Sequence, residues 1–98
     1  MWIGWAEFDL LLGDVHSLKA KRAVLRPLLA GLRRETEASV AEVGAHDLHR
    51  RAVVGVAVVA ASAGWVGDVL DRAERLAAEQ PHLVLLSVRR RLRRSEDD

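Results

Sequence analysis

The sequence contains no cysteine, so disulfide bonds and thiolate metal sites are excluded. It also lacks a secretory signal, because the first charged residue is the acidic Glu7 and no small-residue cleavage site follows an apolar segment. The longest uncharged run, residues 52–67, contains glycines and a serine, which favours a buried strand and a turn over a membrane span. We therefore expect a soluble, cytoplasmic protein with no membrane partner.

The motifs of common catalytic sites are missing as well, since the chain has no Gly-rich phosphate loop, nucleophile elbow or Ser/His/Asp arrangement. Glu7 and Asp9 lie two positions apart on a predicted strand, where they would share a face and offer a carboxylate pair for acid–base chemistry. Ion pairs with Arg89 and Arg91 on a neighbouring strand explain these carboxylates more simply. We therefore predict that the protein is not an enzyme and needs no cofactor.

The length and composition suit one globular domain. Half of the 98 residues are apolar and 30 % are charged, and the chain is too short for a second core. A domain of this size buries roughly 60–70 % of its unfolded surface and can fold without disulfide bonds. We place the domain at residues 1–94 and expect the acidic tail, residues 95–98, to fray.

Hydrophobic periodicity predicts four strands and two helices. Apolar residues alternate in the first strand, whereas the β-branched third strand is apolar on both faces, as expected of a central strand. A serine in a good N-cap position opens each helix. The strands are expected at residues 1–12, 38–43, 51–61 and 82–92, and the helices run from Ser17 to about residue 35 and, after Ser62, over about residues 64–79.

Pro27 conflicts with the first predicted helix, because a proline inside a helix removes a hydrogen bond and costs about 3 kcal/mol. We expect a kink near Ala23, and two helices broken at Pro27 are the alternative. In either case the order of elements is β-α-β-β-α-β. Two right-handed split βαβ units then give a ferredoxin-like α+β fold: a four-stranded antiparallel sheet with both helices on one face, the first and third strands in its centre.

The alternation of side chains along each strand predicts which residues lie on the face of the sheet that the helices do not cover. Strict alternation turns Val84, Leu86, Val88 and Leu92 towards the helices. The open side would then show many apolar residues, more than a monomer usually exposes. A homodimer, formed through sheet faces or edge strands, would bury them. The residues expected on the open side are Ile3, Trp5, Leu11, Leu83, Leu85, Ser87, Arg89 and Arg91, with one face of the third strand.

Basic residues are segregated along the chain, and the segment from Ser17 to Arg34 contains no acidic residue. Such clusters are typical of surfaces that contact nucleic-acid phosphates, and a solvated charged face is the alternative. Trp5 is the one aromatic residue expected on the open sheet face, so we expect the basic helix and tail, and not base stacking, to bind RNA. The candidate nucleic-acid-binding residues are Lys19, Lys21, Arg22, Arg26, Arg50, Arg51, Arg89 and Arg91.

The turn before the third strand carries a second candidate site, made of polar residues. His46 and His49 have the spacing that presents two imidazoles to one metal, and Asp47 could add a carboxylate. A catalytic zinc needs a third protein ligand, which His16, His82 or Glu42 would have to supply from elsewhere. Because turns are commonly polar for solvation alone, we predict no metal there. Glu42, His46, Asp47 and His49 remain a possible polar site with a structural or partner-contact role.

Three stretches of the chain resemble the YlxP-like family of small bacterial proteins: residues 17–22 (SLKAKR), 39–44 (SVAEVG) and, within 47–59, Asp47-Leu48 and the segment from Arg50 to Val59. With the final strand, the resemblance covers nearly the whole chain. It implies the ferredoxin-like fold and a genomic setting among genes for translation initiation and ribosome maturation, near ribosome-binding factor A. It implies no catalytic residues.

Together these observations predict a non-enzymatic binding module associated with RNA or the ribosome, with ribosomal RNA or the small ribosomal subunit as its partner. The alternative is a dimeric protein-interaction or structural module without a nucleic-acid role.

Overall fold

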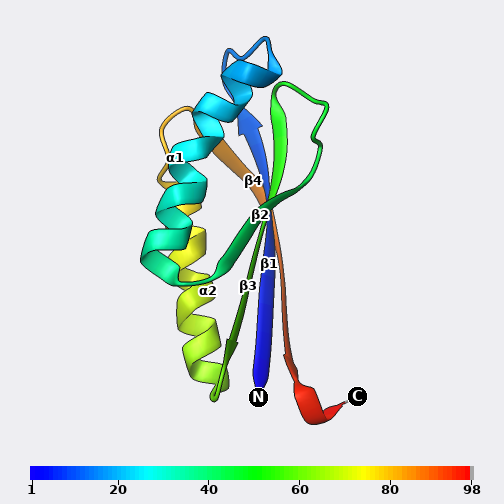
Figure 1. Ribbon diagram of the computed structural model, residues 1–98, viewed down its shortest axis with the longest axis vertical. Coiled ribbons are helices and arrows are strands. Elements are labelled where there is room, and N and C mark those ends of the chain that lie inside the picture. The colour runs from blue at the N-terminus through cyan, green and yellow to red at the C-terminus, as the bar shows by residue number, and fades with distance from the viewer. Residues whose placement is uncertain (98) are drawn as a thin grey trace.

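A computed structural model describes residues 1–97, and in it the elements follow one another in the predicted β-α-β-β-α-β order (Figure 1). A short 3-10 turn follows the last strand. The bounds are β1 Trp2–Leu12, α1 Leu18–Thr36, β2 Ser39–Gly44, β3 Arg51–Ala60, α2 Ala63–Ala78, β4 Leu83–Arg94 and η1 Ser95–Asp97.

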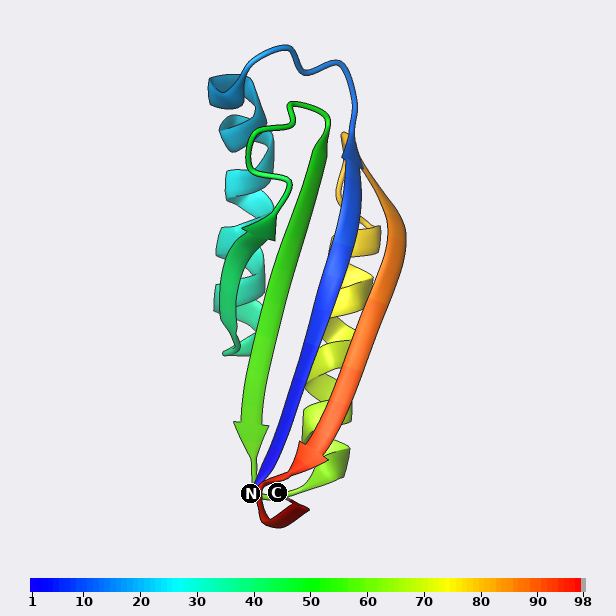
Figure 2. The same cartoon turned by 90° about the vertical axis from the view of Figure 1, so that its right-hand side faces the viewer.

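The four strands form one antiparallel sheet in the order β2-β3-β1-β4, so β1 and β3 are central and β2 and β4 form the edges. Both helices cover the same face of the sheet, and the opposite face is open (Figure 2). The predicted ferredoxin-like α+β fold is therefore confirmed. Neither helix within residues 1–97 combines the length and apolar character needed to cross a membrane.

The core lies between the sheet and the two helices. Alternate residues of the central strands, such as Phe8 and Val54, are fully buried there, and Leu28 of α1 and Val66 of α2 pack against them. Burying one such side chain stabilises the fold by about 1.5–3 kcal/mol. The helices begin where the sequence predicts. The Ser17 hydroxyl accepts from the Ala20 N–H at 3.0 Å, and the Ser62 hydroxyl accepts from the Trp65 N–H at 3.2 Å.

Helix α1 continues without a break through Pro27, so the alternative of two separate helices is wrong. Pro27 lies on the exposed side of α1, where no packing against the sheet depends on it. The helix ends at Thr36, and the left-handed Glu37 (φ 57°) turns the chain into β2. Packing of the buried side of α1 therefore outweighs the hydrogen bond that the proline removes.

The alternation predicted for β4 is wrong over residues 83–86. The pairing with β1 shifts between Asp9 and Leu10, so that Asp9 pairs with Ser87 and Leu10 with Leu85. Leu86 is the extra residue of this bulge, and an extra residue reverses the facing of everything before it. Leu85 therefore packs against the core and Val84 is exposed on the open face. Leu83 also lies on the helix side, whereas Val88 and Leu92 keep their predicted facing.

The first residues of the predicted tail form the 3-10 turn η1 and make contacts of their own. The Ser95 N–H donates to the Met1 carbonyl at 2.9 Å, and the Arg94 Nε lies 2.9 Å from a carboxylate oxygen of Glu96. The bond between Ser95 and Met1 joins the end of β4 to the start of β1. Asp98, the last residue of the predicted tail, lies outside the described residues.

Gly4 allows α2 to approach β1 closely, and we predict that Gly4→Ala is destabilising. A Cβ there would lie 2.2 Å from Val66 Cγ1, so the helix must shift. Overpacking of this kind lowers the free energy of unfolding by about 1–3 kcal/mol, measurable by chemical denaturation. Gly67→Ala is the matched control, because a Cβ at Gly67 meets nothing within 4 Å. It should raise stability by up to about 1 kcal/mol, and equal effects at both positions would contradict this packing.

Candidate nucleic-acid interface

Helix α1 carries a row of exposed cations along one side, which we call the α1 basic stripe: Lys19, Arg22, Arg26 and Arg33. Each residue of a helix turns by about 100°, so spacings of 3, 7 and 14 residues return to nearly the same side. No acidic residue lies in the first turn of α1. Within residues 1–97, Lys19, Arg22 and Arg26 make no ion pair. Lys19, Arg22 and Arg26 therefore form a cationic surface, and Arg33 lies two helical turns further along the same side.

The α1 basic stripe lies beside the free edge of the sheet. Arg33 Nη2 donates to the Val40 carbonyl of β2 at 2.8 Å, which ties the far end of the stripe to the edge strand. Arg33 was not among the predicted binding residues. Its spacing of seven from Arg26 is the signal in the sequence that would have identified it.

Lys21 was predicted to contact phosphates, and the structure corrects this. Its side chain is 2 % exposed and points into the protein. Its Nζ lies 2.9 Å from Glu42 Oε2 and donates to the carbonyls of Ala45 and His46 at 2.7 and 3.4 Å. The sequence contained the signal, because Lys21 shares its helix side with Leu25, Leu28 and Leu32. An ammonium bonded in this way is not available to RNA.

Arg50 and Arg51 also hold the fold together. Arg50 Nε donates to the carbonyls of Leu12 and Gly13 at 3.2 and 2.8 Å, which secures the end of β1. Arg51 Nη2 lies 2.7 Å from both carboxylate oxygens of Asp9. This hydrogen bond and the charge of Asp9 raise the pKa of Arg51 above its ordinary value. A raised arginine pKa keeps the pair charged up to strongly alkaline pH, so it adds no pH dependence near neutrality.

Arg89 and Arg91 lie on the open face of the sheet, as predicted. Arg89 lies 3.9 Å from Glu7, which confirms one of the two predicted ion pairs across β1 and β4. The other is wrong, because Asp9 pairs with Arg51 of β3. Since α1 covers the opposite face, these arginines and the α1 basic stripe form two separate surfaces (Figure 2).

The predicted polar site does not come together as one cluster. The Glu42 carboxylate is engaged by Lys21, and His46 Nε2 lies 3.2 Å from the Glu42 backbone carbonyl. Asp47 and His49 are exposed in the loop between β2 and β3. Among the described residues no group of three His, Cys, Asp or Glu side chains is placed to hold a metal ion.

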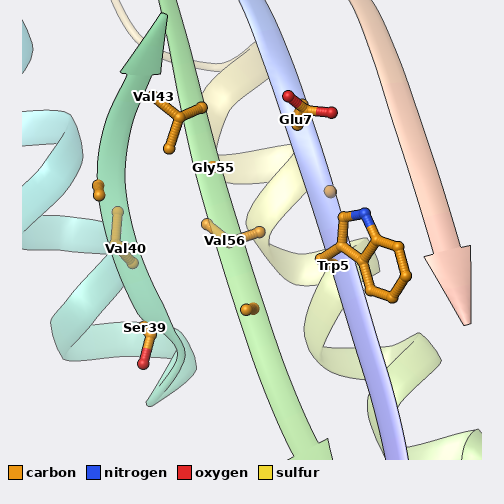
Figure 3. A pocket seen from close by; sticks show the side chains of 10 residues that line it. Trp5, Glu7, Ser39, Val40, Val43, Gly55 and Val56 are labelled. Atoms are coloured by element: carbon orange, nitrogen blue, oxygen red, sulfur yellow. The ribbon is translucent and has the colours of Figure 1, made fainter. Parts of the chain in front are cut away.

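The open face contains a hollow that the sequence did not predict (Figure 3). Gly55 and Ala57 of β3 line it, between Val43 of β2 and Trp5 of β1. It has a volume of about 400 Å³ and is lined mainly by apolar atoms. The signal in the sequence is the pair of small residues inside the β-branched run of β3. We call this feature the Trp5 hollow.

The family model described as "Protein of unknown function (DUF503)" matches residues 3–90. The chain belongs to this family. Over 60 residues it is 38 % identical to the "Uncharacterized protein YlxP" of Bacillus subtilis (strain 168), and the match covers 61 % of this chain and 65 % of that protein. The predicted YlxP-like family is therefore confirmed. Two of the stretches that carried the resemblance meet in the structure, where Lys21 of one contacts Glu42 of the other.

A solved structure of SnoaB, a cofactor-independent oxygenase from Streptomyces nogalater, is similar with a TM-score of 0.47 and 10 % identity, over 99 % of this chain and 95 % of SnoaB. This match contradicts the expectation that the protein is not an enzyme, and we withdraw that expectation. At this level of similarity the match carries no argument about an activity of this chain.

We predict that Lys21→Met lowers the free energy of unfolding by about 2–3 kcal/mol, because it leaves the Glu42 carboxylate without its cation. The loss stays moderate because Glu42 is 22 % exposed. Chemical denaturation measures it. Lys19→Met, two residues away on the exposed side, is the control and should change stability by less than about 0.5 kcal/mol. Equal stability of the two variants would contradict a structural role for Lys21.

Proposed function

We propose that the protein is an RNA-binding module associated with the ribosome, and that it contacts phosphates through the α1 basic stripe. The observation that carries this proposal is the exposure of Lys19, Arg22 and Arg26 on one side of α1 with no acidic neighbour in the first turn. Cations of this kind displace the counterions of a nucleic acid when they bind it, which favours binding at low salt.

The dimensions of the stripe also favour a long polyanion over a single phosphate. Lys19 and Arg33 are 14 positions apart, which corresponds to about 21 Å along a helix. Arg22 and Arg26 lie between them and provide charge along this length. A nucleic-acid backbone offers phosphates over such a distance.

The choice of partner rests on the family resemblance. YlxP-like proteins are expected in a genomic setting of translation initiation and ribosome maturation genes, which supports the small ribosomal subunit or its RNA as the target in the cytoplasm. A genomic setting is an association, not a mechanism. The geometry of α1 supplies the physical part of the argument.

We predict that Arg22→Glu/Arg26→Glu abolishes retention on small ribosomal subunits. Wild-type protein should cosediment with subunits at about 50 mM salt and much less at about 200 mM, as phosphate-driven binding does. Where residual binding is measurable, losing two phosphate contacts should reduce the slope of log affinity against log salt by about 2. Both arginines are exposed, so the melting temperature should not fall.

Arg72→Glu/Arg75→Glu is the matched control, because it changes the net charge equally on the exposed side of α2. It should retain most of the binding. Equal loss in both double variants would show that only net charge matters, and unchanged binding in the α1 variant would remove the α1 basic stripe as the site. No binding of wild-type protein to subunits or unrelated RNA at low salt would overturn the proposed function.

A dimeric protein-interaction module is the second candidate, favoured by apolar side chains on the open face. Val43, Val59 and Val84 are 49 %, 61 % and 56 % exposed there. Pairing of two open faces would remove them from water. Under this candidate we expect sedimentation velocity at micromolar concentration to give a dimer, and Val59→Asp to give a monomer. A monomeric wild-type protein would rule it out.

A further inference from the structure

We propose that the open sheet face is a second RNA site, which takes single-stranded RNA by stacking a base on Trp5 and holding the adjoining phosphates with the arginines of β4. The inference rests on the proposed RNA-binding function and adds to it a substrate class and a site apart from α1. It reverses the expectation that the sheet does not stack bases.

Trp5 is placed as a stacking residue should be. It lies on central strand β1, opposite Ala57 of β3 and Arg91 of β4. Figure 3 shows its indole on the β4 side of β1, with a face of the ring turned away from the sheet. Stacking on an aromatic ring is the main way in which proteins hold the unpaired bases of single-stranded RNA.

The Trp5 hollow provides the space that a base needs beside the ring. The hollow lies on the β3 side of Trp5, where the small side chains of Gly55 and Ala57 leave room for the nucleotide next to the stacked base. Val43 closes the far side and lies above Gly55, where an added Cβ would come within 3.1 Å of it. The apolar lining fits the face of a base, and Ser39 at the rim provides a polar contact.

The charges of the open face favour RNA over a second copy of this chain. Arg89, Arg91 and Arg93 occupy alternate positions of β4 on this face, beside Trp5. Arg51, Arg89 and Arg91 give this face three positive charges, against the two carboxylates of Asp9 and Glu7, which pair with Arg51 and Arg89. Two copies pressed face to face would bring two positively charged faces together at an energetic cost, whereas RNA would bring negative charge to this face.

The site should prefer single strands. Bases in a duplex are stacked on one another and cannot lie flat on Trp5, while the exposed α1 basic stripe can contact the backbone of either form. The two sites lie on opposite sides of the sheet, so their contributions can be separated by the choice of probe and variant.

The test uses Trp5→Leu in the full chain, with a short single-stranded oligoadenylate and a duplex RNA as probes. We expect Trp5→Leu to weaken oligoadenylate binding about ten-fold or more, the usual effect of losing one stacked base. Duplex binding should not change. Trp65→Leu, at a 57 % exposed tryptophan of α2, is the matched control and should leave both affinities unchanged.

Ala57→Leu is a second variant, which distinguishes loss of the binding site from misfolding of Trp5→Leu. It fills the Trp5 hollow and leaves the indole in place, and the exposed position tolerates a larger side chain. We expect the same selective loss of oligoadenylate binding. In a Trp2→Phe/Trp65→Phe background, Trp5 is the single tryptophan left, and oligoadenylate should quench its fluorescence.

Unchanged oligoadenylate affinity in both Trp5→Leu and Ala57→Leu would overturn the inference. So would a dimer that Trp5→Leu converts to a monomer, since a second copy would then occupy this face. If subunit binding still depends on Arg22 and Arg26 in either case, the proposed function survives and only the second site fails. If wild-type protein binds neither probe nor subunits, both fail together.

Discussion

The buried ion pair between Lys21 and Glu42, together with the leucines buried on the same side of α1, fixes the rotation of the helix on the sheet, and both surfaces of the helix depend on it. The Lys21 ammonium contacts the Glu42 carboxylate and the backbone carbonyls of Ala45 and His46. If the ammonium moved out to solvent, these three groups would lose their partner, which is energetically costly. With Lys21 turned inward, Lys19 and Arg22 must point outward. One internal contact thus separates a structural cation from cations that are free to bind.

The sheet likewise separates arginines with a structural contact from arginines on the open face. Strand alternation sends Arg90 to the helix side, where Asp71 engages it at 2.7 Å, and sends Arg89 and Arg91 to the open face. The bulge near Asp9 keeps this facing compatible with a half-buried Leu85 that packs against the core. The result is an open face that is apolar around Trp5 and cationic along β4, a combination suited to a ligand with flat rings and negative charges.

Cationic surfaces on both sides of one sheet fit a long, flexible polyanion better than a small molecule. Under the proposed function, the α1 basic stripe would bind through charge alone and would not distinguish one sequence from another. The proposed second site would add stacking on Trp5, which requires unpaired bases.

The sequence by itself determined the elements, their order and the fold, because periodicity and the caps at Ser17 and Ser62 are local properties of the chain. The sequence also showed which elements carry the basic residues, but it did not show which groups those residues contact. Only the tertiary structure decided that Lys21 pairs with Glu42 and that Leu83 faces the core, since a distant carboxylate and a bulge set these outcomes. The Trp5 hollow likewise requires β1, β2 and β3 side by side, so Gly55 and Ala57 line a hollow only once the sheet has formed.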